Sequence, residues 1–328
     1  MPGVDTEIVV VGAGVMGLAT ARALARSGRD VVVCEQFELG HARGSSHGTS
    51  RIVRLSYPEA RWVRLAQESY PLWRELEAER GQTLLELRGT LDLGDWEPNR
   101  DALAACGVPF EVLERTELER RFAISADVGL FQADGGIVRA DRALAALADG
   151  LAVRERTKAG SIEETDDGVA VGGLRARAVV VTAGAWAPEL VGVDAVPTVE
   201  TVSYFELEEP VPSVIETSTG PHPGYALASP GGVLKAGLHQ SGPTADLDQA
   251  AQPDDALAAQ TAAWVERRFL GAGAATARET CLYTTRAHDE FLLERRGRVV
   301  VGSACSGHGF KFAPVIGQRL AALALEAV

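Results

Sequence analysis

The sequence is poor in lysine. Only three of its 328 residues are lysine, Lys158, Lys235 and Lys311, although lysine and arginine together number 32. In a chain that uses arginine almost everywhere else, a retained lysine indicates a position where a compact ammonium on a flexible stem is needed. Two of the three lysines fall in motifs described below.

Cysteine is also scarce, and no two cysteines are close in sequence. The four, with no Cys-x-x-Cys pair among them, are Cys34, Cys106, Cys281 and Cys305. This spacing disfavours a zinc site and a disulfide framework, so we predict no bound metal. Each cysteine is first interpreted as a small buried apolar residue.

Long apolar runs and excess positive charge are absent as well. No run of about 18 apolar residues occurs, and Asp5 and Glu7 precede the first strand, so we expect no membrane span, no signal peptide and a cytoplasmic location. The net charge of −13 argues against nucleic acid or an anionic membrane as partner. The length suits two domains.

What the sequence does contain is a strand, a glycine turn and a helix near its start. Ile8–Val11 is β-branched, Gly12-Ala13-Gly14-Val15-Met16-Gly17 follows, and an alanine-rich helical pattern leaves it. Gly12 permits the turn, Gly14 lets a pyrophosphate approach the helix N-terminus, and Gly17 allows close packing. The alternative is a purely structural glycine turn.

A second strand, Val31–Cys34, ends in Glu35, about 20 residues after the turn. A carboxylate at this place accepts hydrogen bonds from an adenosine ribose and disfavours a 2′-phosphate. The sequence therefore predicts dinucleotide binding, with FAD or NAD favoured over NADP.

Three later stretches suit close approach of a ligand. Residues 39–57 form a polar loop rich in Gly, Ser and His, and Thr182–Trp186 is a small-residue turn after a buried strand. Residues 304–314 form a glycine-rich turn before a terminal helix over 315–328, which offers helix N-terminal amides. A solvated loop and a structural turn are the alternatives for the first two.

Between these stretches the patterns predict a second, antiparallel domain. Residues 62–80 have helical spacing, residues 84–94 indicate a pair of alternating strands, and 116–121 indicates a short capped helix. In the stretch 231–239, Lys235 and His239 share one sheet face with Gly237. An inward lysine must be paired or functional, whereas an outward one is an ordinary surface residue.

Together the motifs resemble monomeric sarcosine oxidase and N-methyltryptophan oxidase, within the D-amino-acid-oxidase-like flavoproteins. The stretches that carry the resemblance are 12–17, 44–54, 182–186, 281–284 and 306–313. The resemblance implies a mixed α/β fold, with a Rossmann-type FAD-binding domain and an inserted antiparallel-sheet substrate domain. We assign the FAD-binding domain to 1–85, 140–195 and 281–328, and the substrate domain to 86–139 and 196–280.

The resemblance also implies roles for individual residues. Arg54 and Lys311 would bind the substrate carboxylate, and Lys235 would stabilise negative charge that develops on oxygen. Cys281 would join the flavin covalently. His47 and Arg51 resemble a basic pair beside the flavin, His239 an active-site histidine, and Tyr57 and Tyr225 residues of the substrate pocket, Tyr225 with a spacing one residue off.

The cofactor-binding residues implied in this way form a larger set. They are Gly12, Gly14, Val15, Met16, Gly17, Glu35, Gln36, Ser45, Ser46, His47, Arg51, Val153, Ala183, Gly184, Cys281, Tyr283, Gly307, His308, Gly309, Phe310 and Lys311. Ser46 stands where the family commonly has the first of two adjacent histidines, and we assign it no catalytic role.

The implied activity is oxidation of a secondary or tertiary amine on an amino acid by FAD and O2, with hydrogen peroxide as product, and the resemblance implies a monomer. The chain is several tens of residues shorter than is usual in the family, so sarcosine itself does not follow as substrate. An NAD-dependent dehydrogenase is one alternative, disfavoured by the ligand motifs at 183–186 and 306–311. A flavoprotein subunit without activity is another, disfavoured by the intact Lys235, Cys281 and Lys311.

Overall fold

The computed structural model describes residues 4–328, and the chain forms two compact units. Unit 1 comprises the chain up to Gly48 together with Asp141–Pro197 and Leu282–Val328. Unit 2 comprises Thr49–Ala140 and Thr198–Cys281. Residues 49–85, which we expected in the FAD-binding domain, are thus grouped with unit 2. The predicted mixed α/β fold is confirmed, with one largely parallel and one largely antiparallel sheet.

The sheet of unit 1 is built around β1 (Thr6–Val11), which runs parallel to β2 (Val31–Cys34) and to β12 (Leu174–Val181). β9 (Ala152–Arg154) and β19 (Val299–Ser303) extend the parallel part. The antiparallel additions are β10 (Glu163–Thr165), β11 (Gly168–Val171) and β18 (Leu292–Arg296). Continuous runs of buried valine in β1 and β12 are typical of parallel strands that are covered on both faces.

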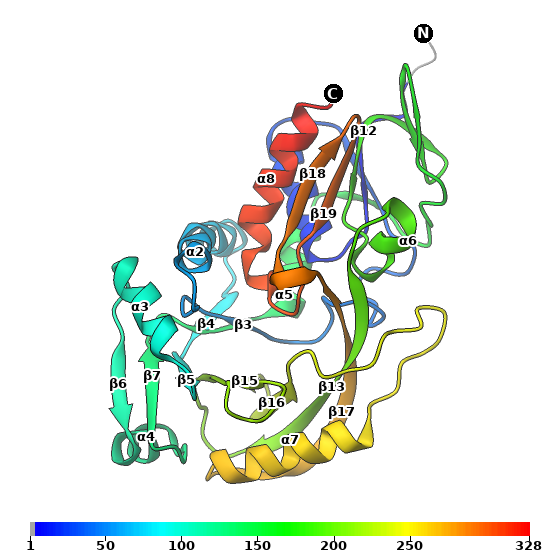
Figure 1. The fold of residues 1–328 in the computed structure, drawn as a ribbon. Coiled ribbons are helices and arrows are strands. Elements are labelled where there is room, and N and C mark those ends of the chain that lie inside the picture. The colour runs from blue at the N-terminus through cyan, green and yellow to red at the C-terminus, as the bar shows by residue number, and fades with distance from the viewer. Residues whose placement is uncertain (1–3) are drawn as a thin grey trace. The chain divides into compact units, whose positions relative to one another are not determined.

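The first and last helices of the chain pack against each other in unit 1. A Cβ added to Gly317 in α8 (Ala313–Leu325) would lie 2.6 Å from the carbonyl carbon of Ala19 in α1 (Val15–Arg26). α8 also lies along β18 and β19 (Figure 1). The close packing places the C-terminal segment beside the helix that follows the glycine turn.

Unit 2 contains an eight-stranded sheet in the order β17-β13-β16-β15-β14-β5-β7-β6. In chain order these strands are β5 (Thr90–Leu93), β6 (Glu111–Glu114), β7 (Val128–Gln132), β13 (Val196–Leu207), β14 (Ser213–Glu216), β15 (Gly224–Ser229), β16 (Val233–Leu238) and β17 (Ala272–Thr285). β14 and β5 pair in parallel, and the other pairings with a described register are antiparallel. The boundary between the units falls inside β17, after Cys281.

One face of this sheet is covered by α7 (Asp255–Arg268) (Figure 1). Leu234 and Ala236 of β16 belong to the same buried apolar cluster as Trp264 and Val265 of the helix. Because side chains alternate along a strand, residues 235 and 237 project from the opposite face. The helix begins at a capping residue, Asp254, whose carboxylate accepts hydrogen bonds from two backbone N–H groups.

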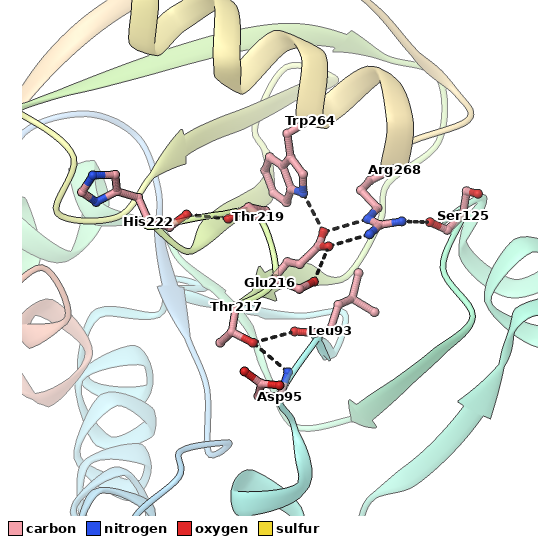
Figure 2. Close-up of polar contacts among 10 residues, drawn as sticks. Leu93, Asp95, Ser125, Glu216, Thr217, Thr219, His222, Trp264 and Arg268 are labelled. Atoms are coloured by element: carbon pink, nitrogen blue, oxygen red, sulfur yellow. Dashed lines mark hydrogen bonds and ion pairs between the residues drawn. The ribbon is translucent and has the colours of Figure 1, made fainter.

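A buried carboxylate ties α7 to β14 (Figure 2). Glu216 accepts hydrogen bonds from Trp264 Nε1 at 2.6 Å, from Arg268 Nε at 2.8 Å and Nη2 at 2.6 Å, and from Ser218 Oγ at 2.9 Å. Arg268 Nη1 donates to the Ser125 carbonyl at 2.9 Å. These bonds join three segments of unit 2 that are distant in sequence.

A second, three-stranded sheet of unit 2 has the order β3-β8-β4, and its strands are β3 (Arg51–Val53), β8 (Gly136–Val138) and β4 (Leu85–Leu87). The two strands that we predicted within residues 84–94 are present as β4 and β5, but they do not pair with each other, since they lie in different sheets. The chain turns at Gly89, whose φ of +89° favours glycine, and so passes from one sheet to the other.

The remaining helices include the two that the sequence patterns predict over 62–80 and 116–121. They are α2 (Ala60–Arg80), α3 (Glu97–Ala105), α4 (Arg115–Phe122), α5 (Ala140–Ala148) and α6 (Ala187–Val191). The helix predicted over 62–80 is confirmed as α2. The short helix predicted over 116–121 is present as α4, but no side chain caps its N-terminus, so the predicted cap is wrong.

Candidate functional site

The glycine turn of unit 1 has no room for side chains. Gly12 has φ +97°, and a Cβ there would lie 2.6 Å from the Thr182 carbonyl oxygen. A Cβ on Gly17 would lie 1.8 Å from the Gly12 carbonyl oxygen. Gly14 precedes α1 as its N-cap without a side-chain cap, and the first turn of α1 carries no acidic residue. This arrangement suits an anionic ligand at the helix N-terminus.

Glu35 is buried beside this turn. Its Oε2 accepts a hydrogen bond from Ala13 N–H at 2.8 Å, and its Oε1 accepts one from Phe37 N–H at 3.0 Å and lies 3.4 Å from His41 Nε2. Burial opposes the charge of this carboxylate, but the hydrogen bonds from His41, Ala13 and Phe37 outweigh it and lower the pKa of Glu35. An ionised carboxylate at this position can accept hydrogen bonds from ribose hydroxyls.

Other predicted cofactor residues lie around the same turn. Val15 N–H donates to Ser46 Oγ at 3.1 Å, which places the polar loop against the first turn of α1. A Cβ on Gly309 would lie 3.2 Å from Met16 Cε. The Thr182 hydroxyl donates to the Val11 carbonyl at 2.9 Å. Segments from the start, the middle and the end of the sequence therefore meet at the glycine turn.

The rest of the predicted cofactor set in unit 1 extends outward from these contacts. Ser45 Oγ lies 4.0 Å from Cys305 Sγ, and His47 Nδ1 lies 3.0 Å from the Gly44 carbonyl. Val153 of β9 pairs with Val33 of β2. The others that belong to this unit are Gln36, Ala183, Gly184, Tyr283, Gly307, His308 and Phe310.

Lys311 lies in a short 3-10 turn, η3 (Gly309–Phe312), rather than in the terminal helix. The predicted order of a glycine-rich turn followed by a terminal helix is confirmed, with η3 inside the turn and α8 beginning at Ala313 rather than at the predicted Val315. The buried ammonium of Lys311 donates to the His308 carbonyl at 2.7 Å and lies 5.2 Å from the Phe312 ring centroid.

These observations test whether the residues of unit 1 fit a dinucleotide. The backbone at Gly12 and Gly17 excludes side chains, the helix N-terminus carries no acid, and Glu35 is held ionised next to the turn. A group with a pyrophosphate and a ribose diol needs these three features. The described residues therefore fit FAD.

A row of polar side chains crosses the sheet of unit 2 on the face opposite α7. We call it the lysine face and define it as Tyr204, Tyr225, Lys235, Glu279 and Cys281. Tyr204 of β13 is opposite Lys235 of β16 in the strand register, and Tyr225 of β15 is opposite Gly237. Glu279 and Cys281 are two residues apart on β17, the strand beside β13, so they share a face.

Lys235 is buried on this face, with 5% of its side chain exposed. Its ammonium donates to Glu279 Oε1 at 2.8 Å, and the Tyr204 hydroxyl donates to the same oxygen. Burial and the nearby Arg51 guanidinium lower the pKa of Lys235, while Glu279 and Cys281 act in the opposite direction. The lysine is thus inward and paired, which removes the alternative of an ordinary surface residue.

The other predicted residues of unit 2 lie near or on the lysine face. Arg51 Nη2 lies 3.8 Å from Cys281 Sγ. A Cβ on Gly237 would lie 2.7 Å from the Tyr225 hydroxyl oxygen, so glycine at 237 lets the tyrosine lie across β16. His239 follows the end of β16, where its backbone N–H donates to the Pro223 carbonyl at 2.7 Å.

Arg54 has a buried carboxylate partner in Asp92 of β5, with Arg54 Nη1 at 3.0 Å from Asp92 Oδ1. Ser56 and Asn99 also donate to Asp92, yet burial outweighs all three partners and raises the pKa of this carboxyl. The Arg54 guanidinium lies 4.4 Å from the Tyr57 ring centroid. Burial raises the pKa of the Tyr57 hydroxyl to about 12.

Sequence reasoning missed Glu279, Tyr204 and Asp92. A signal existed for two of them. Glu279 is two residues before Cys281, so the two share a face of any strand that contains both, and an inward lysine requires a carboxylate partner. Asp92 stands between two buried leucines of a strand, where a lone acid also requires a partner. Nothing local in the sequence marks Tyr204.

Within residues 4–328, no three His, Cys, Asp or Glu side chains are grouped so that they could hold a metal ion. The helices described in the same range are too short or too polar to cross a membrane.

Comparisons with known proteins identify relatives over nearly the whole chain. A family model described as "DAO: FAD dependent oxidoreductase" matches residues 7–323. A probable sarcosine oxidase from Arabidopsis thaliana is 30% identical, covering 98% of this chain and 88% of its own. A peroxisomal sarcosine oxidase from Mus musculus is 31% identical, covering 98% and 92%. The solved structure of NikD, an unusual amino acid oxidase essential for nikkomycin biosynthesis, matches with a TM-score of 0.88 at 26% identity, covering 98% and 94%.

Proposed function

This chain belongs to the family of FAD-dependent oxidoreductases, and from that premise we propose that it oxidises a secondary or tertiary amine of an amino acid, with O2 as electron acceptor. N-methyl and cyclic amino acids are the proposed substrate classes. The products are an imine, which water hydrolyses, and hydrogen peroxide. The observation that carries the proposal is the lysine face, where a buried ammonium lies among a guanidinium, a carboxylate and a thiol.

The residues that would hold FAD are those of the glycine turn, with Glu35 at the ribose, and Cys281 as a covalent anchor through its sulfur. FAD, when bound, supplies two-electron chemistry, which is acceptance of a hydride equivalent from the carbon next to the amine nitrogen and delivery of the electrons to O2. Arg51, at 3.8 Å from Cys281, would place positive charge beside this position.

Arg54 and Lys311 are the proposed ligands of the substrate carboxylate. A guanidinium has five N–H donors, so the bond from Arg54 to Asp92 is compatible with a second acceptor. Because Asp92 and the Tyr57 ring hold the guanidinium in place, it would orient the substrate at little entropic cost. The Lys235 ammonium would stabilise negative charge that develops on oxygen.

Two other readings are less well supported. An NAD-dependent dehydrogenase does not require the C-terminal segment, yet a Cβ on Gly309 of that segment would lie 3.2 Å from Met16 in the glycine turn. A subunit without activity would have no need of a buried lysine, whose burial costs free energy.

The test is an absorbance spectrum of the purified protein before and after acid precipitation, followed by a peroxide assay with N-methyl and cyclic amino acids. We expect flavin absorbance in the pellet for the wild type and in the supernatant for Cys281→Ser. Cys106→Ser is the matched control and should behave as the wild type. Flavin that stays in the pellet with Cys281→Ser would exclude this cysteine as the anchor, and a protein without flavin or peroxide would overturn the proposal.

We also propose that the enzyme is a cytoplasmic monomer. Light scattering of the holoenzyme at several concentrations tests the oligomeric state, and a constant mass of twice the monomer value would contradict the proposal. Fractionation of the producing cells tests the location.

A further inference from the structure

Lys235 lies at a buried position, where the protonated form of a lysine is unfavourable. The residue lies in the middle of β16, opposite Tyr204, and 5% of its side chain is exposed. Moving an ammonium out of water is unfavourable unless a partner compensates its charge. The side chain of Glu279 provides that partner at 2.8 Å and is itself 30% exposed, so the anionic member of the pair is the more accessible to solvent.

Glu279 is in turn held by Tyr204. Both the Tyr204 hydroxyl and the Lys235 ammonium donate to Glu279 Oε1, and the ammonium lies 5.5 Å from the Tyr204 ring centroid. The strand order β17-β13-β16 places the tyrosine between the other two residues. The three side chains therefore form one hydrogen-bonded row across adjacent strands.

The charges that act on Lys235 come from three neighbours. Arg51 opposes its protonation, whereas Glu279 and Cys281 favour it. Tyr204 and Tyr225 are further titratable side chains on the lysine face. Burial together with the adjacent Glu279 raises the pKa of Tyr204, so it stays neutral and acts as a donor. Glu279 is thus the carboxylate that acts against burial and the Arg51 guanidinium, although these two still lower the pKa of Lys235 on balance.

We propose that Glu279, held by Tyr204, is the positioning residue that keeps Lys235 protonated and aimed along the lysine face. The inference rests on the proposed function, in which the positive charge of Lys235 speeds the reaction with O2. It follows that removal of the Glu279 charge leaves the lysine in place, but the lysine then loses its proton at a lower pH than in the wild type. Reoxidation by O2 then loses its electrostatic support at a pH where the wild type retains it.

The first experiment measures the charge of Lys235 directly. Because the chain has three lysines, labelling with [ε-13C]lysine yields three resonances, which Lys158→Arg and Lys311→Arg assign. In Glu279→Gln we expect the titration midpoint of Lys235 to fall by at least about one pH unit. Glu279→Asp, which keeps the charge, should restore most of the difference, and Tyr204→Phe should cause a smaller decrease. Lys158 serves as the internal reference. An unchanged midpoint in Glu279→Gln overturns the inference.

The second experiment measures reoxidation of the reduced holoenzyme by O2 across pH 6–10 and, separately, its anaerobic reduction by substrate. In both proteins we expect the reoxidation rate to fall about tenfold as Lys235 loses its proton, and in Glu279→Gln this fall should occur at a pH about one unit lower than in the wild type. The rate of anaerobic reduction should change less than about threefold. If Lys235→Met is reoxidised slowly but Glu279→Gln has the same pH dependence of reoxidation as the wild type, the inference is overturned. If Lys235→Met reoxidises as fast as the wild type, the role of Lys235 in the proposed function fails, and with it the catalytic part of this inference, while the NMR titration still decides whether Glu279 controls the charge.

Discussion

Unit 2 contains two ion pairs that differ in which member is buried, the anion or the cation. Figure 2 shows the contacts of the pair Glu216–Arg268. The side chain of its carboxylate is 1% exposed and that of its cation 28%. In the pair Lys235–Glu279 the cation is 5% exposed and the carboxylate 30%. One pair therefore buries its anion and the other its cation.

The surroundings of the buried members also differ. Hydrogen bonds from Arg268 and Trp264 outweigh the burial of Glu216 and lower its pKa, so the fold favours its charged form. Burial and Arg51 lower the pKa of Lys235, so the fold disfavours its charged form. A buried group whose charged form is favoured by its partners is typical of a structural contact. A buried group whose pKa is shifted against its charged form is typical of a functional site.

The largest expected effect comes from breaking the structural pair. Arg268→Met leaves Glu216 buried without its cation, and we expect the free energy of unfolding to fall by about 3 kcal/mol. Urea unfolding measures this, with the exposed neighbour Arg267→Met as control. Loss of less than about 1 kcal/mol would show that Trp264 and Ser218 suffice to compensate Glu216.

A third pair, Arg54–Asp92, has both members largely buried, at 14% and 4%. Asp92→Asn removes the charge that holds Arg54, and we expect a loss of about 2 kcal/mol in the free energy of unfolding. We also expect a severalfold rise in KM for carboxylated amines, because Arg54 is no longer fixed. Asp95→Asn, at an exposed position in the same segment, is the control. An unchanged KM would separate Asp92 from substrate binding.

Lys235→Met should sharpen the comparison because stability and function respond in opposite directions. At pH 7 we expect the variant to be as stable as the wild type or up to about 1 kcal/mol more stable, but slow in reoxidation. The pKa of Lys235 is lower in the folded protein than the value of about 10.4 in an unfolded chain, so the folded state binds fewer protons between the two values. Wild-type stability therefore rises with pH through that window, and the advantage of the variant should shrink.

Unfolding of both proteins at several pH values between 6 and 10 checks this trend. The linkage at Glu216 has the same sign, because a lowered pKa again means that the unfolded state binds more protons, but it acts at acidic pH. Its lowered pKa adds stability that is present above about 4.3, the usual glutamate value, and is lost as pH falls through the lowered pKa. A Lys235→Met advantage that grows with pH would contradict the assigned direction for the lysine.

The smallest effect is expected at a surface pair. Arg278 Nη1 lies 2.6 Å from Asp255 Oδ1, and the side chains are 43% and 95% exposed. Arg278→Gln should change the free energy of unfolding by less than about 0.5 kcal/mol, since solvent and salt screen such a pair. A larger loss in the same urea experiments would mean that exposure is a poor guide to these pairs.

Much of the fold and of the nucleotide turn was predictable because it depends on local spacing. The strand, the turn with Gly12 and Gly17, and the helix after it follow from residues that are neighbours in sequence. The family predicted from five short motifs is confirmed by a model that matches residues 7–323. The roles of individual site residues stay predictions.

The pairings of charged residues were not predictable in the same way. Strand periodicity shows that Lys235 and Gly237 share a face, but not which strand lies next to β16 or in which register. Glu279 is 44 residues from Lys235, and Asp92 is 38 residues from Arg54. The sheet change at Gly89 was missed for the same reason, because two consecutive strands need not pair.

By itself, then, the amino-acid sequence determined the elements, the glycine turn with its acid, and the family. Backbone hydrogen bonding in helices and the periodicity of side chains depend on residues that are close in sequence, so short stretches are enough to predict them. The tertiary structure alone decided which carboxylate compensates which cation. That choice depends on strand order and on what is buried, and both are set by packing of the whole unit.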